Sequence, residues 1–332
     1  MVGKRPRFWD RKGALSMALM PLAGLFGLLV AVRRGAYRLG VFRSHRLPVP
    51  VLVVGNITVG GSGKTPLVLW IVEFLAARGW MPGIVSRGYG GRSSEWPQRV
   101  TPDSDPRKVG DEPVLLARRA ACPVAVGPNR PKACELLLAA GCDIVVSDDG
   151  MQHYALERDL EIMVSDGRTG LGNGRLIPAG PLREPYGRSR NADLIVANGE
   201  PTNDADFHME ISVGDAVSVA QPGLQRSLSS FAGQEVDAVA GIGHPERFFH
   251  CLQEAGLQAR CHAFPDHHEF RPRDMDFRPH RPILMTEKDA VKYKAWFPKD
   301  CWYVPVEAKL SDQFAGALDD ALRRITAHES TR

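Results

Sequence analysis

The chain has 332 residues, of which 44% are hydrophobic and 24% are charged. This composition excludes a largely disordered protein and predicts one large or two ordinary folded domains. The formal charge of +4 is concentrated at the start, because residues 1–46 carry ten Lys or Arg against one acid, Asp10. These cations surround an apolar run, so they favour a negatively charged membrane surface as the partner and argue against a nucleic acid.

The first predicted element is this apolar run, twenty uncharged residues at 13–32. Its length would allow a helix to span a bilayer. A single span would leave the five preceding cations on the side opposite a cytoplasmic body, against the positive-inside tendency. A helix that lies in the interface and breaks near Pro21 avoids this conflict. We therefore expect a membrane-associated segment at 1–46, monotopic or single-span, with a buried core helix as the other alternative.

A strand at 51–54 and a helix at 66–79 flank a glycine-rich string, and this order predicts a phosphate-binding loop. Lys64 is expected to neutralise nucleotide phosphates, and Thr65 to offer its hydroxyl to Mg²⁺. Thr58 replaces the usual first glycine, which the loop tolerates if Thr58 has a negative φ. The alternative is a strand-to-helix turn without a ligand. The residues expected to bind the nucleotide are Thr58, Val59, Gly60, Gly61, Ser62, Gly63, Lys64 and Thr65.

Strands and helices then alternate at short spacing. Strands are predicted at 81–86, 123–127, 143–148, 160–166 and 192–199, and helices at 112–120 and 130–141, with a polar surface excursion at 92–110. Such an order predicts a P-loop NTPase-like α/β core at 47–200, with a parallel sheet covered by helices on both faces. Six cysteines at irregular spacings favour a reducing compartment.

Two carboxylates, Asp148 and Asp149, follow the apolar strand at 143–148. A phosphate loop needs such a carboxylate at a neighbouring strand end to hold Mg²⁺. We expect one of them to bind the metal or its waters and the other to support it, without assigning which. The alternative is a turn formed by Asp149 and Gly150.

The rest of the chain predicts a second, smaller α/β lobe at 236–332, after a polar connecting segment at 201–235. Strands are expected at 282–286 and 302–306, and a final helix at 312–327. The histidines near 262–268 match no familiar four-ligand zinc spacing. The string "TEKDAVK" at 286–292 is expected to stabilise this lobe or its hinge, with a surface ion pair of Lys288 and Asp289 as the alternative.

Taken together, these motifs resemble the tetraacyldisaccharide 4'-kinase family. The matching strings occur in the family's order: "GNITVGGSGKTP", "SRGYGG", "VGDEPVLLA", "SDDGMQH", "GRLIPAGPLREP", "GIGHPERFF", "FPDHHEF" and "TEKDAVK". In that family the phosphate loop begins with Ser or Thr, which agrees with Thr58. The resemblance implies an ATP- and Mg²⁺-dependent kinase at the cytoplasmic face of the inner membrane. Its acceptor would be the 4'-hydroxyl of a tetraacyldisaccharide 1-phosphate, a lipid A precursor.

The resemblance also implies roles for two residues. Asp111 would be the catalytic base, with a helix N-cap as its alternative role. His267 would pair with Asp111 and orient it or raise its basicity, the alternative being a surface histidine. If the two residues work together, the second lobe must close over the first.

The remaining candidates rest on residue chemistry. Glu184, in a loop rich in Pro and Gly, is a candidate to complete the metal environment, unless that loop is only a rigid connection. Arg130 is a candidate to bind the substrate's phosphate, because a guanidinium matches phosphate geometry, with a salt bridge as the alternative. Arg87 and Tyr89 are candidates to contact the sugar or phosphates, unless their glycine-rich loop is a tight turn.

A rival hypothesis is a P-loop NTPase that acts as a membrane-associated switch or targeting factor. GTPases of that kind carry a guanine-reading N-K-x-D string, which this sequence lacks. A noncatalytic scaffold with a relic nucleotide fold is disfavoured by the intact Lys64, Thr65 and paired aspartates.

Overall fold

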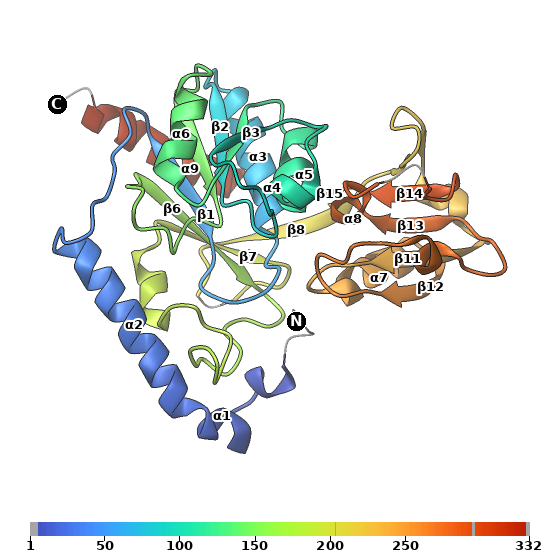
Figure 1. Cartoon of the computed structure of the whole chain (residues 1–332), viewed down its shortest axis with the longest axis horizontal. Coiled ribbons are helices and arrows are strands. Elements are labelled where there is room, and N and C mark those ends of the chain that lie inside the picture. Colours follow the sequence, from blue (N-terminus) through green and yellow to red (C-terminus); the bar gives the residue numbers. More distant parts are fainter. Residues whose placement is uncertain (1–5, 203, 294–295, 330–332) are drawn as a thin grey trace.

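The protein has two sheets that lie side by side, each covered by helices (Figure 1). The computed structural model describes residues 6–202, 204–293 and 296–329. The strands of the larger sheet are β1 (Val51–Gly55), β2 (Pro82–Ser86), β3 (Gln98–Val100), β4 (Val124–Val126), β5 (Ile144–Asp148), β6 (Leu160–Asp166), β7 (Leu194–Asn198), β8 (Phe207–Val213) and β15 (Val306–Leu310). The helices of this first lobe are α3 (Lys64–Ala76), α4 (Pro106–Val109), α5 (Asp111–Arg119), α6 (Arg130–Leu138) and α9 (Asp312–Glu329).

The nine strands lie in the order β15-β8-β7-β6-β1-β5-β2-β4-β3, and all pairs except β3·β4 and β8·β15 are parallel. Side chains of β1 alternate between two cores, as the two-residue period of a strand requires. Leu52 and Val54 pack with α3, α5 and α9, whereas Val51 and Val53 pack with α6. The predicted parallel sheet with helices on both faces is confirmed.

The strand order places the candidate site at the carboxyl edge of the sheet. β1 lies between β5 and β6, and Val54 is in register with Asp148 at the end of β5. The loop that follows β1 and the carboxylates that follow β5 therefore emerge next to each other, where open α/β sheets bind ligands.

The second lobe contains a six-stranded sheet in the order β10-β9-β14-β13-β11-β12. Its elements are β9 (Ala216–Ser218), β10 (Gln225–Arg226), β11 (Glu235–Ala240), α7 (Pro245–Glu254), β12 (Gln258–Ala263), β13 (Ile283–Thr286), α8 (Glu287–Ala290) and β14 (Cys301–Val304). The chain enters this lobe after β8 and leaves it at β15, and these two antiparallel strands extend toward it from the first sheet (Figure 1).

The boundaries of the lobes differ from those expected from the sequence. Strand β15 pairs with β8 in the first sheet, and α9 buries Phe314 and Leu318 against the first core. Residues 306–329 thus return to the first lobe, and the segment expected as a connection at 201–235 contains β8, β9 and β10. The apolar side of α9 requires a core, and the first sheet supplies it.

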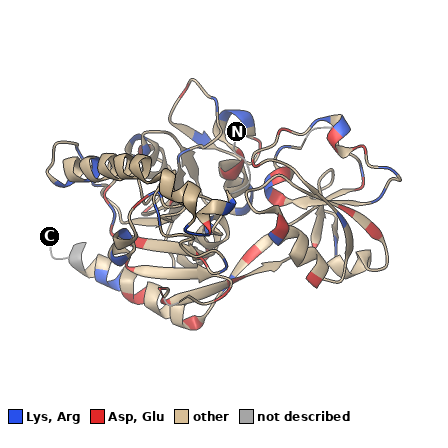
Figure 2. Cartoon of the chain, turned by 90° about the horizontal axis from the view of Figure 1, so that it is seen from below, with Lys and Arg blue, Asp and Glu red and all other residues tan. Residues whose placement is uncertain are grey.

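The N-terminal segment forms two helices, α1 (Ala14–Ala18) and α2 (Met20–Arg38), with Pro21 in the first turn of α2. The expected break near Pro21 is confirmed. Buried Ser16 donates a hydrogen bond to the carbonyl oxygen of Ala179 at 2.5 Å, which fixes α1 to the first lobe. Figure 2 shows α2 uncharged over most of its length, with its arginines toward its C-terminal end.

Most large side chains of α2 point away from the protein. Leu22, Leu25, Leu28, Leu29 and Val32 are each more than half exposed. The alternative of a buried core helix is therefore wrong. Among the helices in the described part of the chain, none combines the length and apolarity that a bilayer crossing demands.

Candidate active site

The glycine-rich loop has the backbone expected of a phosphate-binding loop. It leads from β1 directly into α3, which begins at Lys64. Gly63 has a φ of 87°, and a Cβ atom there would collide with the side chain of Asn198, so only glycine fits. Within the described residues, positive φ outside glycine occurs only at Asp149 and His267, so the negative φ required of Thr58 is confirmed.

Hydrogen bonds hold this loop from several sides. The amide of Val59 donates to the carbonyl oxygen of Pro181 at 2.9 Å, and the amide of Arg183 donates to that of Ile57 at 2.7 Å. Inside the loop, the Asn56 amide group donates to Ser62 Oγ at 3.1 Å. These bonds fix the loop before any ligand arrives, which favours tight binding of an anion.

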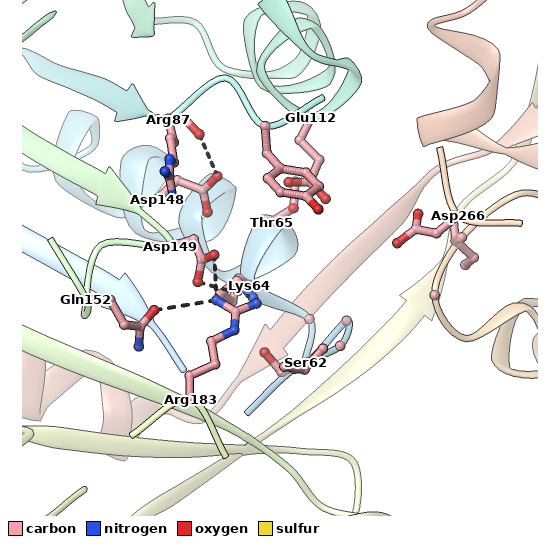
Figure 3. Close-up of a pocket in the computed structure, with 18 of the residues that line it drawn as sticks. Ser62, Lys64, Thr65, Arg87, Glu112, Asp148, Asp149, Gln152, Arg183 and Asp266 are labelled. Atoms are coloured by element: carbon pink, nitrogen blue, oxygen red, sulfur yellow. Dashed lines mark hydrogen bonds and ion pairs between the residues drawn. The ribbon is translucent and has the colours of Figure 1, made fainter. Parts of the chain in front are cut away.

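Behind the loop, Asp149 lies between two cations (Figure 3). Its Oδ2 accepts a hydrogen bond from Arg183 Nη1 at 3.0 Å, and its Oδ1 is 3.5 Å from Lys64 Nζ. Burial raises the pKa of Asp149, but Lys64 and Arg183 outweigh that effect and leave the pKa below its ordinary value. Asp149 is therefore ionised at neutral pH, and its buried Oδ1 accepts no hydrogen bond from the described residues.

The neighbouring Asp148 has the opposite electrostatic surroundings. It is only 2% exposed, and its Oδ2 accepts a 3.3 Å hydrogen bond from Ser86. Burial and the negative charges of Glu112 and Asp149 raise the pKa of Asp148 to about 7. Lys64 and Arg130 oppose this rise only in part, and a further cation near this carboxylate would lower the pKa of Asp148.

The oxygen atoms at the ends of β5 and the phosphate loop suit Mg²⁺ better than a metal ion whose ligands all come from protein side chains. In the ranges that the structure describes, no three His, Cys, Asp or Glu side chains gather to hold a metal ion. Mg²⁺ normally uses one or two carboxylates together with water and phosphate oxygens. Thr65, Asp148 and the Oδ1 atom of Asp149, which accepts no hydrogen bond from the described residues, supply oxygens of this kind in one cavity.

Glu184 lines the same cavity but is already engaged by the protein. It is 1% exposed, and Tyr154 Oη lies 2.6 and 2.8 Å from its two carboxylate oxygens. Arg188 Nε is 3.6 Å from Oε2. Direct metal binding by Glu184 therefore remains a prediction that requires these partners to share the carboxylate.

Asp111 and His267 come from different lobes and meet. Asp111 begins α5, and His267 follows β12 with a φ of 60°. His267 Nδ1 is 2.9 Å from both oxygens of Asp111. Burial raises the pKa of Asp111, but His267, Lys288 and Lys292 outweigh it and lower the pKa below its usual range. His267 lines the cavity, and Asp111 lies behind it.

The other residues expected to contact the substrate differ in their exposure and in the hydrogen bonds that they already make. Arg87 and Tyr89 line the cavity, and the Tyr89 ring, 59% exposed, lies 5.5 Å from that of His267. Arg130 is 2% exposed and donates to Ser147 Oγ and to the carbonyl oxygens of Asp148 and Asp149. Its guanidinium thus fixes the end of β5, which no spacing in the sequence indicates.

The string "TEKDAVK" contributes lysines to the site that the sequence analysis did not assign. Lys288 Nζ is 2.8 Å from Glu112 Oε1 and 3.2 Å from Asp266 Oδ1, and Lys292 Nζ is 3.5 Å from Asp111 Oδ2. Asp289 is fully buried. The suggested surface ion pair of Lys288 with Asp289 is therefore wrong, because Lys288 pairs with other carboxylates in a buried place.

Most of these groups line one cavity of about 1720 Å³ between the lobes, although Asp111 and Lys292 are not among its lining residues. Figure 3 shows Ser62, Lys64 and Thr65 on one side, with Asp266 of the second lobe facing them. The cavity extends to α2, where its lining residues are Phe26, Leu29, Val30, Arg33 and Tyr37. Gln152, three residues after Asp149, also lines it, and its place in the "SDDGMQH" string was the available signal for it.

Comparisons with known proteins agree over nearly the whole chain. A family model described as LpxK, tetraacyldisaccharide-1-P 4'-kinase, matches residues 15–323. The tetraacyldisaccharide 4'-kinase of Alkalilimnicola ehrlichii is 52% identical over 322 residues, which cover 96% of this chain and 97% of that protein. The protein of the same name from Halorhodospira halophila is 51% identical over 328 residues, 98% of each chain. The solved structure of LpxK from Aquifex aeolicus in complex with ATP has a TM-score of 0.79 and 29% identity, and covers 94% of this chain and 99% of that one.

Proposed function

This chain belongs to the tetraacyldisaccharide 4'-kinase family, and we propose that it transfers the γ-phosphate of ATP to the 4'-hydroxyl of a tetraacyldisaccharide 1-phosphate. The reaction is a step of lipid A biosynthesis. The observation that carries the proposal is the convergence of the phosphate loop, the paired aspartates and the Asp111–His267 pair on one cavity that reaches α2.

The loop at 58–65 binds the triphosphate through its backbone amides and the N-terminal end of α3. Lys64 neutralises phosphate charge that grows during transfer. Thr65 and the aspartates Asp148 and Asp149 hold Mg²⁺, with Glu184 as a further candidate. When bound, the metal neutralises the phosphate oxygens and aligns them for transfer. Arg183, which is bonded to Asp149, keeps that carboxylate ionised and in place.

The proton of the acceptor hydroxyl passes to the Asp111–His267 pair. The two groups are in hydrogen-bond contact, so they act together on the proton. Asp111 has the role of base that the family resemblance implies, and His267 extends the pair into the cavity. Arg87 and Tyr89 line the same cavity and contact the sugar or its phosphate. A role for Arg130 with the substrate phosphate would require its present hydrogen bonds to be released.

The acceptor reaches this site from a membrane surface. Basic residues Arg33, Arg34 and Arg38 and the exposed apolar side chains of α2 suit an interfacial helix on an anionic bilayer. We place this surface at the cytoplasmic face of the inner membrane, with α2 as a monotopic anchor. The apolar part of the cavity beside α2 then faces the acyl chains.

The proposal is tested by incubating the purified chain with labelled ATP and Mg²⁺, with and without the lipid disaccharide. We expect labelled lipid that appears only when the acceptor, the metal and the chain are all present. Hydrolysis of ATP at the same rate without the acceptor, and no lipid product, would instead support the switch hypothesis. The Lys64→Ala variant controls for a contaminating kinase.

A further inference from the structure

Lys292 lies beside the Asp111–His267 pair and has no role in the function described so far. It follows α8 in the second lobe, whereas Asp111 begins α5 in the first. Its Nζ is 3.5 Å from Asp111 Oδ2, and its side chain is 12% exposed. A charge in such a position acts strongly, because the surrounding protein screens it less than water would.

The ammonium group of Lys292 is held in place by Asp289. Asp289 Oδ1 accepts a hydrogen bond from Lys292 Nζ at 2.9 Å. The other oxygen, Oδ2, accepts from Thr286 Oγ1 at 2.6 Å and from the amide of Gly241 at 2.8 Å. Asp289 is completely buried, so the end of β11 and the start of α8 together fix its direction. Lys292 therefore presents its charge at a defined point.

The Asp111 carboxylate needs such a charge. It is 5% exposed, and its hydrogen bonds come from the His267 imidazole and, at Oδ1, from the Glu112 amide at 3.0 Å. A buried carboxylate without a positive partner is costly to ionise and becomes protonated instead. Lys288 also lowers the pKa of Asp111, but its hydrogen bonds go to Glu112 and Asp266. Lys292 is the lysine that touches Asp111 itself.

We propose that Lys292, oriented by Asp289, is a positioning residue that keeps the Asp111 carboxylate ionised and turned toward His267. It acts through Asp111 and does not contact the substrate. The second lobe then supplies both the imidazole and the counter-charge, so the proton-accepting pair is complete only when the lobes meet. This inference rests on the proposed kinase function.

The test uses the full chain with Lys292→Met, which removes the charge, and Lys292→Arg, which keeps it. Lys299→Met, at an exposed position of the same lobe, is the matched control. We expect Lys292→Met to lower kcat by roughly 10- to 100-fold, a fraction of what a proton-transfer group contributes. KM for ATP should change less than twofold, and Lys292→Arg should recover most of the loss.

The pH profile of kcat separates positioning from a purely structural contact. Asp111 faces His267, Lys288 and Lys292, and His267 also faces Asp266. Lys292 is one of the groups that lower the pKa of Asp111, so its loss favours protonated Asp111, and the acidic limb of the profile should move to higher pH in Lys292→Met. An equal loss at every pH, or activity equal to that of Lys299→Met, would overturn the proposal.

A double-mutant cycle with Asp111→Asn gives an independent result. We expect Lys292→Met to cause no further loss of kcat in the Asp111→Asn background, and a full multiplicative loss would contradict the inference. Nucleotide binding confirms that each variant is folded, and Lys292→Gln replaces Lys292→Met if the latter does not fold. If the wild-type chain makes no phosphorylated lipid, the proposed function fails; if it does and Lys292→Met behaves as wild type, only this inference fails.

Discussion

Adjacent residues at the end of β5 have opposite acid–base behaviour. Asp149 has Lys64 and Arg183 as partners, whereas Asp148 is buried and faces Glu112 and Asp149, which raises its pKa to about 7. In the absence of metal, Asp148 is thus partly protonated near neutral pH. This difference indicates that a bound cation would change the ionisation of Asp148 more than that of Asp149.

A pH-dependent stability follows for the metal-free protein. The pKa of Asp148 rises from 3.8 to about 7 on folding, so the native state binds more protons than the unfolded state between these values. The free energy of unfolding contributed by Asp148 therefore decreases as the pH rises through this window, by up to about 4 kcal/mol. Urea unfolding in EDTA at pH 4 to 8 measures this free energy. The stability of Asp148→Asn relative to that of wild type should increase as the pH rises. A stability difference from wild type that does not change with pH, as expected for the exposed Asp103→Asn control, would contradict this prediction.

Substitution of Asp111 should separate chemistry from nucleotide binding. We expect Asp111→Asn to lower kcat by about 10²- to 10⁴-fold, the range for a lost general base. Its affinity for ATP should be unchanged, since Asp111 does not line the cavity. Because the pair acts as a unit, the Asp111→Asn/His267→Gln double variant should be no slower than the poorer single variant. Steady-state kinetics with the lipid acceptor test this, and fully additive losses would argue for separate roles.

Residue types and strand ends predicted which candidate residues would lie together, because the ends of parallel strands meet at one edge. Lys64, Thr65, Asp148 and Asp149 lie together for this reason. The contact of Asp111 with His267 joins residues 156 positions apart, and only the family resemblance indicated it. The burial of Arg130 could not be predicted, since it depends on carbonyl oxygens that carry no sequence signal.

Helix α2 is the element whose surface most clearly lacks a protein partner. Leu25 is 56% exposed and Leu28 59% exposed, and both lie on a helix without acidic residues. We expect Leu25→Glu/Leu28→Glu to weaken binding to anionic liposomes by roughly tenfold or more, because two leucines leave the acyl region. Co-sedimentation measures binding, and Leu224→Glu, at an exposed leucine of the second lobe, is the control. Equal binding of the two variants would place the membrane contact elsewhere.

The elements near the lobe junction show the limit of sequence patterns. The strands around β1 are continuous apolar runs because both their faces are buried, and they were predicted. Strand β8 has a mixed pattern of exposure and was taken as part of a polar connection. The pairing of β8 with β15 joins segments about a hundred residues apart, so local periodicity could not reveal that the chain returns to the first sheet.

At the scale of the molecule, ion pairs join the two lobes outside the β8 and β15 strands. Lys288 pairs with Glu112, Arg119 with Glu287, and Arg247 with Asp166. The first two link α5 to α8, the elements that also bring Asp111 close to Lys292. The same junction therefore holds the lobes together and assembles the proton-accepting pair.

The Arg119–Glu287 pair allows this junction to be loosened without touching Asp111. Arg119 Nη1 is 2.9 Å from Glu287 Oε2, and burial raises the pKa of Glu287 although Arg119 opposes that rise. Arg119→Met leaves this carboxylate without its close partner, so we expect the free energy of unfolding to fall by about 1 to 3 kcal/mol. Arg118→Met, at the exposed neighbouring position on the same helix, should lower the free energy of unfolding much less.

Urea unfolding compares the stability of the two variants. Small-angle scattering should show a larger radius of gyration for Arg119→Met if the lobes separate. Equal stability and equal size would mean that the Arg119–Glu287 pair does not hold the lobes together, and that the strands and the two remaining ion pairs suffice.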